Sequence, residues 1–342
     1  MQAQEQLPGL DLDRFSPWFR ATVPGVGSEP TASLIAGGKS NLTYEVSDGQ
    51  QTWIVRRPPL GHVLATAHDM VREYRVMSAL QDTDVPVPTT YALCRDDSVL
   101  GAPFYVMERM AGTPYRRAEE LAALGPERSR AISERLVDTL TALHAVEPAS
   151  VGLADFGRPE GYLARQVARW KKQLDASYCR DLPAAEELHA RLAADVPPES
   201  AAGIVHGDYR LDNVLVDADD QPTAVLDWEM ATLGDPLADL GLMLVYHRLG
   251  DILGSGSVAD AGSAPGFLGE EEIIARYAAG SDRDLSRFGF YLGLAAYKLA
   301  AILEGIHYRH LHGQTVGTGF AEIGDAIHPL LDAGLSALKE NH

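Results

Sequence analysis

The stretch that decides the fold of this 342-residue chain is His206-Gly-Asp-Tyr-Arg-Leu-Asp-Asn-Val-Leu-Val-Asp217, which is followed by Val225-Leu-Asp-Trp-Glu229. It contains Asp208, Asn213 and Asp227 in that order. Phosphoryl transfer from a nucleotide needs a carboxylate that accepts a proton and hard oxygen ligands for Mg²⁺, because the protein mainly positions reactants and metal ions. The pattern therefore predicts a site that uses ATP or GTP, with Asp208 as base and the other two residues as metal ligands.

Local patterning around this stretch predicts a strand, a tight loop and a strand pair, in the ranges 203–206, 209–213, 213–216 and 223–226, with a turn at 217–222. The last strand would deliver Asp227 beside the loop that carries Asp208. An Asp or Asn in a turn is usually a local hydrogen-bonding cap. Three such residues at this spacing, with His206 two positions before the first, favour the kinase interpretation instead.

Together with Gly234-Asp-Pro-Leu-Ala-Asp-Leu-Gly241, these segments resemble the aminoglycoside phosphotransferase and choline kinase-like family, and most of all the phosphotransferase domains related to those fused to some acyl-CoA dehydrogenases. The resemblance runs from about residue 34 to about residue 309. It implies an α+β, bilobal, protein-kinase-like fold with a small antiparallel-sheet N-terminal lobe and a mostly helical C-terminal lobe. It also implies Mg²⁺- and ATP- or GTP-dependent phosphorylation of a small molecule's hydroxyl. Asp235 and Asp239 match positions that the family uses structurally, the first at a helix start and the second as a buried brace.

The segment Leu34-Ile-Ala-Gly-Gly-Lys-Ser-Asn-Leu-Thr-Tyr-Glu-Val46 predicts a strand, a glycine turn and a strand. Glycines let backbone N–H groups approach phosphate, so Gly38, Ser40 and Asn41 are predicted to contact the nucleotide. An ordinary hairpin is the competing interpretation. The Gly-Lys-Ser run is not a Walker A motif, because Ser33 occupies the position of the first glycine and a strand follows instead of a helix.

The next predicted strand, Trp53-Ile-Val-Arg-Arg-Pro-Pro59, ends where a kinase has its phosphate-binding lysine, and the residue here is Arg56. A guanidinium can bridge phosphates and a carboxylate, although arginine and lysine are not equivalent at such a site. Glu73 is the predicted carboxylate, since residues 69–80 show helical periodicity; the alternative is a solvated helix charge. Because arginine replaces lysine, a catalytically weak or inactive nucleotide-binding regulatory domain is the second hypothesis for function, and a structural module without nucleotide is the third.

Residues 103–112 predict a buried strand that runs into a linker. In the resembling family the adenine or guanine base meets backbone groups here, which implies contacts from Met107, Glu108 and Met110; a plain core strand is the alternative. The predicted lobes are residues 1–107 and 108–342, with the hinge at about 107–112.

Two further motifs are not expected to carry chemistry. Asp155-Phe-Gly157 spells a kinase metal motif, but it precedes Asp208, whereas the metal-binding aspartate must follow the catalytic loop; a turn is expected. His307, His310 and His312 lack a carboxylate or cysteine partner at ligand spacing.

Composition favours a cytoplasmic enzyme without a nucleic-acid or membrane partner. The formal net charge of -19 would repel nucleic-acid phosphates. The N-terminus has no signal-peptide pattern, and the most apolar run, residues 288–303, contains Lys298 and is expected to be too short to span a bilayer. Two cysteines give no disulfide framework. Helices are expected at 127–146, 162–177, 184–194, 270–279, 284–309 and 320–339, and a mobile loop at 250–269.

The predicted acceptor is a hydroxylated small molecule whose class the sequence leaves open. The acidic surroundings of Asp208 suit a cationic amino sugar. A hydroxyacyl compound carried on an anionic coenzyme A thioester would need basic residues near the site, and six candidates are Arg116, Arg117, Arg165, Arg169, Lys171 and Lys172.

Overall fold

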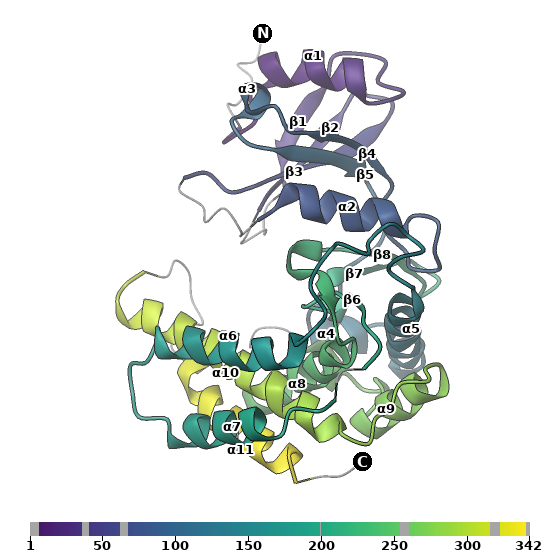
Figure 1. The fold of residues 1–342 in the computed structure, drawn as a ribbon. Coiled ribbons are helices and arrows are strands. Elements are labelled where there is room, and N and C mark those ends of the chain that lie inside the picture. The colour runs from purple at the N-terminus through teal and green to yellow at the C-terminus, as the bar shows by residue number, and fades with distance from the viewer. Residues whose placement is uncertain are drawn as a thin grey trace. The chain divides into compact units, whose positions relative to one another are not determined.

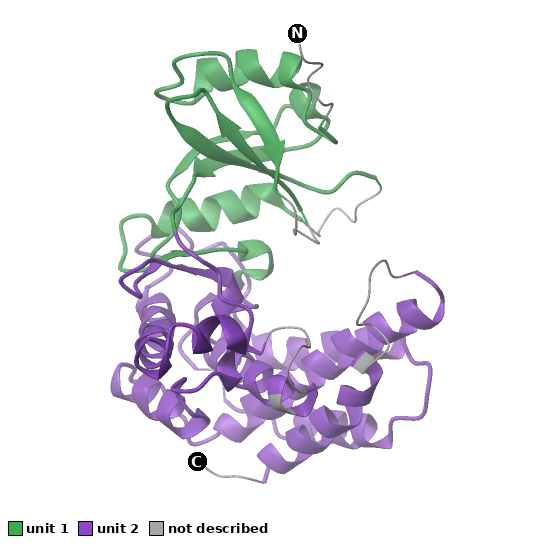
Figure 2. Ribbon diagram, turned by 180° about the vertical axis from the view of Figure 1, so that it is seen from behind, with its two compact units in different colours: residues 1–111, 223–231 green, residues 112–222, 232–342 purple. Residues whose placement is uncertain are grey.

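The computed structural model describes residues 7–35, 41–61, 68–198, 200–253, 260–314 and 322–339 (Figure 1). Its contacts divide the chain into two compact units (Figure 2). Unit 1 comprises Met1–Ala111 and Thr223–Ala231, and unit 2 comprises Gly112–Pro222 and Thr232–His342. The division after residue 111 falls four positions beyond the predicted boundary. The segment Thr223–Ala231, which the prediction had put in the second lobe, belongs to unit 1.

Unit 1 is built on a five-stranded antiparallel sheet in the order β1-β2-β3-β5-β4. Its strands are β1 (Thr31–Leu34), β2 (Leu42–Ser47), β3 (Thr52–Arg57), β4 (Thr90–Cys94) and β5 (Phe104–Glu108). Three helices accompany them: α1 (Leu12–Thr22), α2 (Met70–Leu80) and α3 (Asp97–Leu100). A short 3-10 helix, η2 (Trp228–Met230), comes from the distant segment.

Helix α1 covers one side of this sheet because its aromatic side chains pack on those of the strands. Asp11 caps the helix by accepting from the N–H groups of its first turn. Phe19 meets Trp53 edge to face at 5.2 Å, and both side chains are almost fully buried. Helix α2 is capped in the same way by Asp69, and it carries Glu73 into the interior of unit 1.

Unit 2 is mostly helical, with short strands that carry the loop of interest. Its helices are α4 (Ala118–Ala122), α5 (Pro126–Ala145), α6 (Tyr162–Asp175), α7 (Pro183–Ala194), α8 (Leu237–Leu253), α9 (Glu270–Ala279), α10 (Phe288–Leu311) and α11 (Ile327–Ala337). Four 3-10 or strand segments surround the loop: β6 (Gly203–Val205), η1 (Leu211–Asn213), β7 (Val214–Val216) and β9 (Thr232–Gly234). Two more 3-10 helices are η3 (Ala261–Ser263) and η4 (Glu322–Ala326). Strand β6 pairs antiparallel with β9.

The predicted turn after β7 is present. The Asp217 carboxylate accepts from the backbone N–H groups of Asp219 and Gln221, at 2.9 and 2.8 Å. Strand β8 (Pro222–Val225) follows. Asp155 and Gly157 also lie in a turn segment, as predicted.

The expected helices are confirmed to within four residues at their ends, except that the one expected at 320–339 is α-helical only from Ile327, after the 3-10 helix η4; residues 320–321 lie outside the described part of the chain. Two further corrections concern the ranges 250–269 and 288–303. Residues 250–253, expected as the start of a mobile loop, form the last turn of α8, and residues 254–259 lie outside the described part of the chain. The apolar run at 288–303 continues as α10 to Leu311, so the expectation that it is too short to cross a membrane is wrong. Of its most apolar window, 83% is buried inside the protein, which is the burial of a core helix.

Candidate functional site

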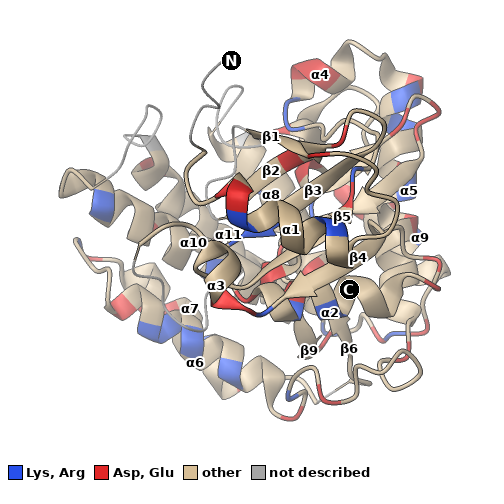
Figure 3. Cartoon of the chain, turned by 90° about the horizontal axis from the view of Figure 1, so that it is seen from above, with Lys and Arg blue, Asp and Glu red and all other residues tan. Residues whose placement is uncertain are grey.

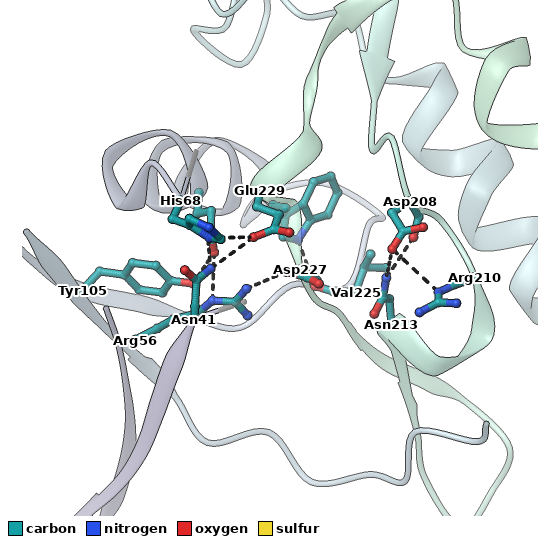
Figure 4. A network of polar contacts seen from close by, with 12 residues as sticks. Asn41, Arg56, His68, Tyr105, Asp208, Arg210, Asn213, Val225, Asp227 and Glu229 are labelled. Carbon is teal, nitrogen blue, oxygen red and sulfur yellow. Dashed lines mark hydrogen bonds and ion pairs between the residues drawn. The ribbon is translucent and has the colours of Figure 1, made fainter. Parts of the chain in front are cut away.

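The loop between β6 and η1 brings Asp208 and Asn213 together in unit 2, as the sequence predicts (Figure 4). The Asn213 amide donates from Nδ2 to the Asp208 carbonyl oxygen at 2.9 Å and to its Oδ2 at 3.3 Å. These bonds orient the amide, so that its Oδ1 is the atom left to act as a ligand. The Asp208 Oδ1 accepts from the hydroxyl of Tyr246 on α8 at 2.8 Å.

A buried carboxylate braces this loop from α8. The Asp239 side chain accepts from the N–H groups of His206 at 2.6 Å and Gly207 at 2.8 Å. His144 on α5 lies 3.4 Å from the same carboxylate through Nε2, and its Nδ1 lies 2.8 Å from the hydroxyl of Tyr277. The predicted role of Asp239 as a buried brace is therefore present in the structure.

The protonation states in this brace follow from burial and hydrogen bonding. Burial lowers the pKa of His144, which favours a neutral ring that donates from Nε2 and accepts at Nδ1. Burial by itself would raise the pKa of Asp239, but hydrogen bonds from His144 and Gly207 outweigh it, and the net shift is downward. Asp239 is therefore an ionised carboxylate that is stabilised by hydrogen bonds from neighbouring groups of the protein.

Sequence reasoning missed two residues beside Asp208. Tyr246 carries the hydroxyl that orients the carboxylate, and burial raises its pKa well above the ordinary value of 10. Arg210 lies with its guanidinium 4.8 Å from the Tyr246 ring centroid, and its Nε is 2.9 Å from Asp212 and 3.7 Å from Asp208. Tyr246 had no sequence signal, because it lies 38 positions along the chain in an apolar helix. Arg210 did have a sequence signal, because it is the one basic residue, by sequence, among the acidic residues between His206 and Asp239.

Unit 1 carries the other half of the predicted constellation. Arg56 Nε lies 3.2 Å from Glu73, and Nη2 lies 2.5 Å from Asp227 Oδ1 (Figure 4). The Glu73 side chain is 1% exposed and also accepts from the Tyr105 hydroxyl at 2.9 Å. The predicted pairing of Arg56 with Glu73 is thus present, and the alternative of a solvated helix charge is wrong.

The electrostatics of this cluster follow from its burial. Burial raises the pKa of Glu73 to about 7, although the Arg56 charge opposes the shift, and the nearby Asp227 and Glu229 carboxylates add to it. One guanidinium therefore faces several carboxylates in a poorly solvated place.

Asn41 joins the same cluster, as a residue predicted to contact nucleotide. Its Nδ2 donates to Glu73 at 3.2 Å and to Glu229 at 3.3 Å. Its Oδ1 is buried without a hydrogen-bond partner in the described part of the chain. Glu229 and His68, whose Nδ1 lies 3.4 Å from it, were not predicted. Gly38 and Ser40 lie outside the described residues.

The predicted base-binding segment is a buried strand that ends in a linker. Met107 is 7% exposed on β5 and pairs with Ile54 of β3. The backbone N–H of Glu108 donates to the Thr89 carbonyl at 2.7 Å, and its carboxylate accepts from the Thr89 hydroxyl. The contacts of Glu108 and Met110 with a nucleotide base stay a prediction.

Donor chemistry fits Mg²⁺, because an amide oxygen on Asn213 and a carboxylate on Asp227 are hard ligands. Asp227 adopts a left-handed backbone with φ 66° at the start of η2, and it pairs with Arg56. It belongs to unit 1 and Asn213 to unit 2, so the convergence of the two metal ligands with Asp208 stays a prediction. Within the described residues, no group of three or more His, Cys, Asp or Glu side chains is arranged to hold a metal ion.

The sequence matches the profile of a known protein family and several known proteins. The profile of the phosphotransferase enzyme family matches residues 31–288. Acyl-CoA dehydrogenase family member 11 of Gallus gallus is 35% identical over 328 residues, which cover 93% of this chain and 42% of that protein. The chain thus spans less than half the length of this relative.

Solved structures share the fold. A protein of Ralstonia eutropha JMP134, provisionally described as an aminoglycoside phosphotransferase, is 32% identical, with a TM-score of 0.85 over 97% of this chain and 99% of its own. Aminoglycoside phosphotransferase APH(4)-Ia, in a ternary complex with AMP-PNP and hygromycin B, is 15% identical, with a TM-score of 0.61 over 95% of this chain and 97% of its own. The predicted kinase-like α+β fold is confirmed.

Proposed function

Since the chain belongs to the phosphotransferase enzyme family, we propose that it transfers a phosphoryl group from ATP or GTP to a hydroxyl of a small molecule. The observation that carries this proposal is the environment of Asp208. Tyr246 and Asn213 hold the carboxylate and its backbone, and Asp239 fixes the two preceding peptide groups. A general base must be held in hydrogen-bonding reach of the proton that it abstracts, and this loop supplies such a base.

The remaining residues have roles in holding the nucleotide. Asn213 and Asp227 are the proposed ligands of Mg²⁺, which when bound would neutralise phosphate charge. Arg56 would contact the phosphates while Glu73 holds its guanidinium. The other proposed nucleotide contacts are Gly38, Ser40, Asn41, Met107, Glu108 and Met110. The fold relative in complex with AMP-PNP supports a nucleotide as donor.

A second candidate function is a nucleotide-binding regulatory domain with little or no turnover. The observation that favours it is the ion pair between Arg56 and Asp227, since the proposed metal ligand is already engaged by a cation that replaces the usual lysine. Binding of metal and nucleotide would have to displace this contact.

Two acceptor classes remain candidates. Hygromycin B in the APH(4)-Ia complex is an example of an amino-sugar compound, and the acyl-CoA dehydrogenase relatives direct attention to hydroxyacyl compounds. Of the six basic residues considered for an anionic acceptor, Arg165, Arg169, Lys171 and Lys172 lie on α6, where basic side chains gather (Figure 3).

The proposal is tested in two steps. Melting temperature is measured with Mg-ATP and Mg-GTP, where a nucleotide at about 100 times its dissociation constant should stabilise by about 2.7 kcal/mol. Nucleotide turnover is then measured with amino sugars, hydroxy acids and hydroxyacyl thioesters. A stabilising shift without turnover on any acceptor would favour the regulatory domain, and no shift with either nucleotide would reject both functions.

Once an acceptor is found, Asp208→Ala should lower kcat about 10²- to 10⁴-fold, because it removes the proton acceptor. Asp219→Ala is the matched control, since Asp219 is an exposed carboxylate in the turn after β7 and should leave kcat unchanged. Asp227→Ala should in addition weaken the nucleotide-induced rise in melting temperature. An Asp208→Ala enzyme with wild-type kcat would remove the base assignment.

A further inference from the structure

Gly207, the residue before Asp208, is held on both sides of its backbone. It has a left-handed φ of 86°, which a residue with a side chain rarely adopts. Its N–H donates to Asp239 on α8, and its carbonyl accepts from Lys298 Nζ on α10 at 2.6 Å. Two helices far apart in the sequence thus fix the peptide groups from which Asp208 projects.

The ammonium of Lys298 contacts groups of the protein itself. Its ammonium lies 5.4 Å from the centroid of the Trp170 ring on α6. The two side chains line a cavity with Gly207, Asp239 and Leu242. This cavity has a volume of about 30 Å³. A volume of this size is enough to hold a water molecule.

The charge of Lys298 also affects the electrostatics around Asp208 and Asp239. Burial lowers the pKa of Lys298, and the opposing charges of the Asp208 and Asp239 carboxylates only partly offset this shift. A cation held among two carboxylates, a carbonyl and an indole ring offsets negative charge that burial would otherwise make costly. A neutral side chain of the same length would leave the Gly207 carbonyl without this donor.

We propose that Lys298 is a positioning residue for phosphoryl transfer: its ammonium holds the Gly207 peptide in the left-handed conformation that aims the Asp208 carboxylate. The catalytic part of this inference rests on the proposed function. The residue need not touch nucleotide or acceptor, so its loss should lower kcat while nucleotide binding is kept.

The test compares Lys298→Met, which has similar length and no donor, with Lys298→Arg, which keeps the charge and the donor. Lys339→Met, at an exposed position just after α11, is the matched control. Hydrogen exchange followed by mass spectrometry measures opening of the loop at residues 203–213 without any turnover. We would also measure, for each variant, the nucleotide-induced shift in melting temperature. The values of kcat and KM are measured with whichever acceptor the turnover experiment identifies.

Lys298→Met should accelerate amide exchange at residues 203–213 about tenfold, the loss expected for one hydrogen bond to a charged donor. Exchange in unit 1 should be unchanged. Misplacement of the base by the order of 1 Å should lower kcat about 10- to 100-fold, with the nucleotide KM and the melting shift close to wild type. Lys298→Arg should recover most of both losses, and Lys339→Met should match the wild type.

Wild-type exchange and kcat in a folded Lys298→Met protein would overturn the inference, as would faster exchange spread evenly over all of unit 2. Exchange confined to the loop with unchanged kcat would reject the catalytic role. If the wild-type protein turns over no acceptor, the proposed function fails, and the exchange data alone still decide whether Lys298 holds the loop.

Discussion

Arg56 makes two ion pairs with separate nitrogens of its guanidinium. Its guanidinium uses Nε toward Glu73 on α2 and Nη2 toward Asp227 in the segment from later in the chain. A lysine ammonium is a point charge on one nitrogen and lacks the planar fork with which the guanidinium meets the two carboxylates through separate nitrogens. The replacement that motivated doubt about turnover therefore has a structural reason within unit 1, whatever its effect on the reaction.

Arg56→Met should destabilise the protein by about 3–5 kcal/mol, because it leaves buried carboxylates without their cation. The matched control is Arg109→Met, whose pair with Glu45 is half exposed on both sides and should contribute about 0–1 kcal/mol. Urea unfolding at neutral pH measures both. Equal losses in the two variants would show that burial of the Arg56 cluster adds nothing.

Glu73 should make stability depend on pH. Its pKa is about 7 in the folded protein, above the ordinary value of 4.5, so the folded state keeps a proton that the unfolded state releases. The stability from this group is complete below pH 4.5 and is lost as pH rises through 7. Unfolding free energies measured across this range should therefore fall in the wild type relative to Glu73→Gln. Parallel curves for the two proteins would contradict the prediction.

At the scale of elements, the loop that carries Asp208 is short and depends on helices that pack against it. Strand β6 has three residues and η1 has three, so local backbone bonding alone cannot fix the loop. The fixed points come from α5, α8 and α10 through His144, Asp239 and Lys298. Helices α5 and α10 formed close to where periodicity predicted them, and α8 follows the helix start that the resemblance implied at Asp235. None of these predictions said which polar residue would face the loop.

Asp239→Asn should cost about 1–3 kcal/mol of stability, since an amide NH₂ would replace one of the two oxygens that accept from His206 and Gly207 and leave a buried N–H unpaired. Asp217→Asn, which changes a partly exposed acceptor in the turn after β7, is the comparison and should cost less. Chemical denaturation and kcat are measured for both. A stable and fully active Asp239→Asn protein would show that Asp239 is not needed to hold the loop.

At the scale of the whole molecule, the chain returns to unit 1 after it has built part of unit 2. Thr223–Ala231 is tied to unit 1 by Val225 N–H on the Pro86 carbonyl at 2.7 Å and by Arg72 on the Ala231 carbonyl at 3.0 Å. It also brings the buried Trp228 and the partner of Arg56. Unit 1 is therefore discontinuous in sequence, which a single predicted boundary did not anticipate.

A fragment of residues 1–111 should melt at a lower temperature, and less cooperatively, than the same fragment joined by a flexible linker to residues 223–231, because the segment buries apolar surface and completes the Arg56 cluster. A joined fragment with Asp227→Leu is the control and should recover only part of the gain. Circular dichroism on heating measures all three. Identical melting of the first two would show that the segment adds no stability to unit 1.

The sequence by itself determined the family, the fold class, most helices and the local arrangement of Asp208 and Asn213. The family and the fold class follow from the resemblance of the quoted motifs to a known family. The helices follow from backbone periodicity, and the local arrangement follows from spacing within a few residues, both of which act over short stretches of chain. The sequence also predicted the pairing of Arg56 with Glu73, because Arg56 stands where a kinase has its phosphate-binding lysine and the helical periodicity of residues 69–80 offered Glu73 as the carboxylate.

Only the tertiary structure decided which distant side chains complete each cluster. Tyr246 and Lys298 reach Asp208 and Gly207 from helices whose sequences read as ordinary core, and Glu229 reaches Asn41 across 188 positions. A polar residue in an apolar helix has the same local pattern whether it faces solvent, a carbonyl or a carboxylate. Its partner is fixed by how the helices pack, which depends on the whole buried surface and not on the residues next to it in the chain.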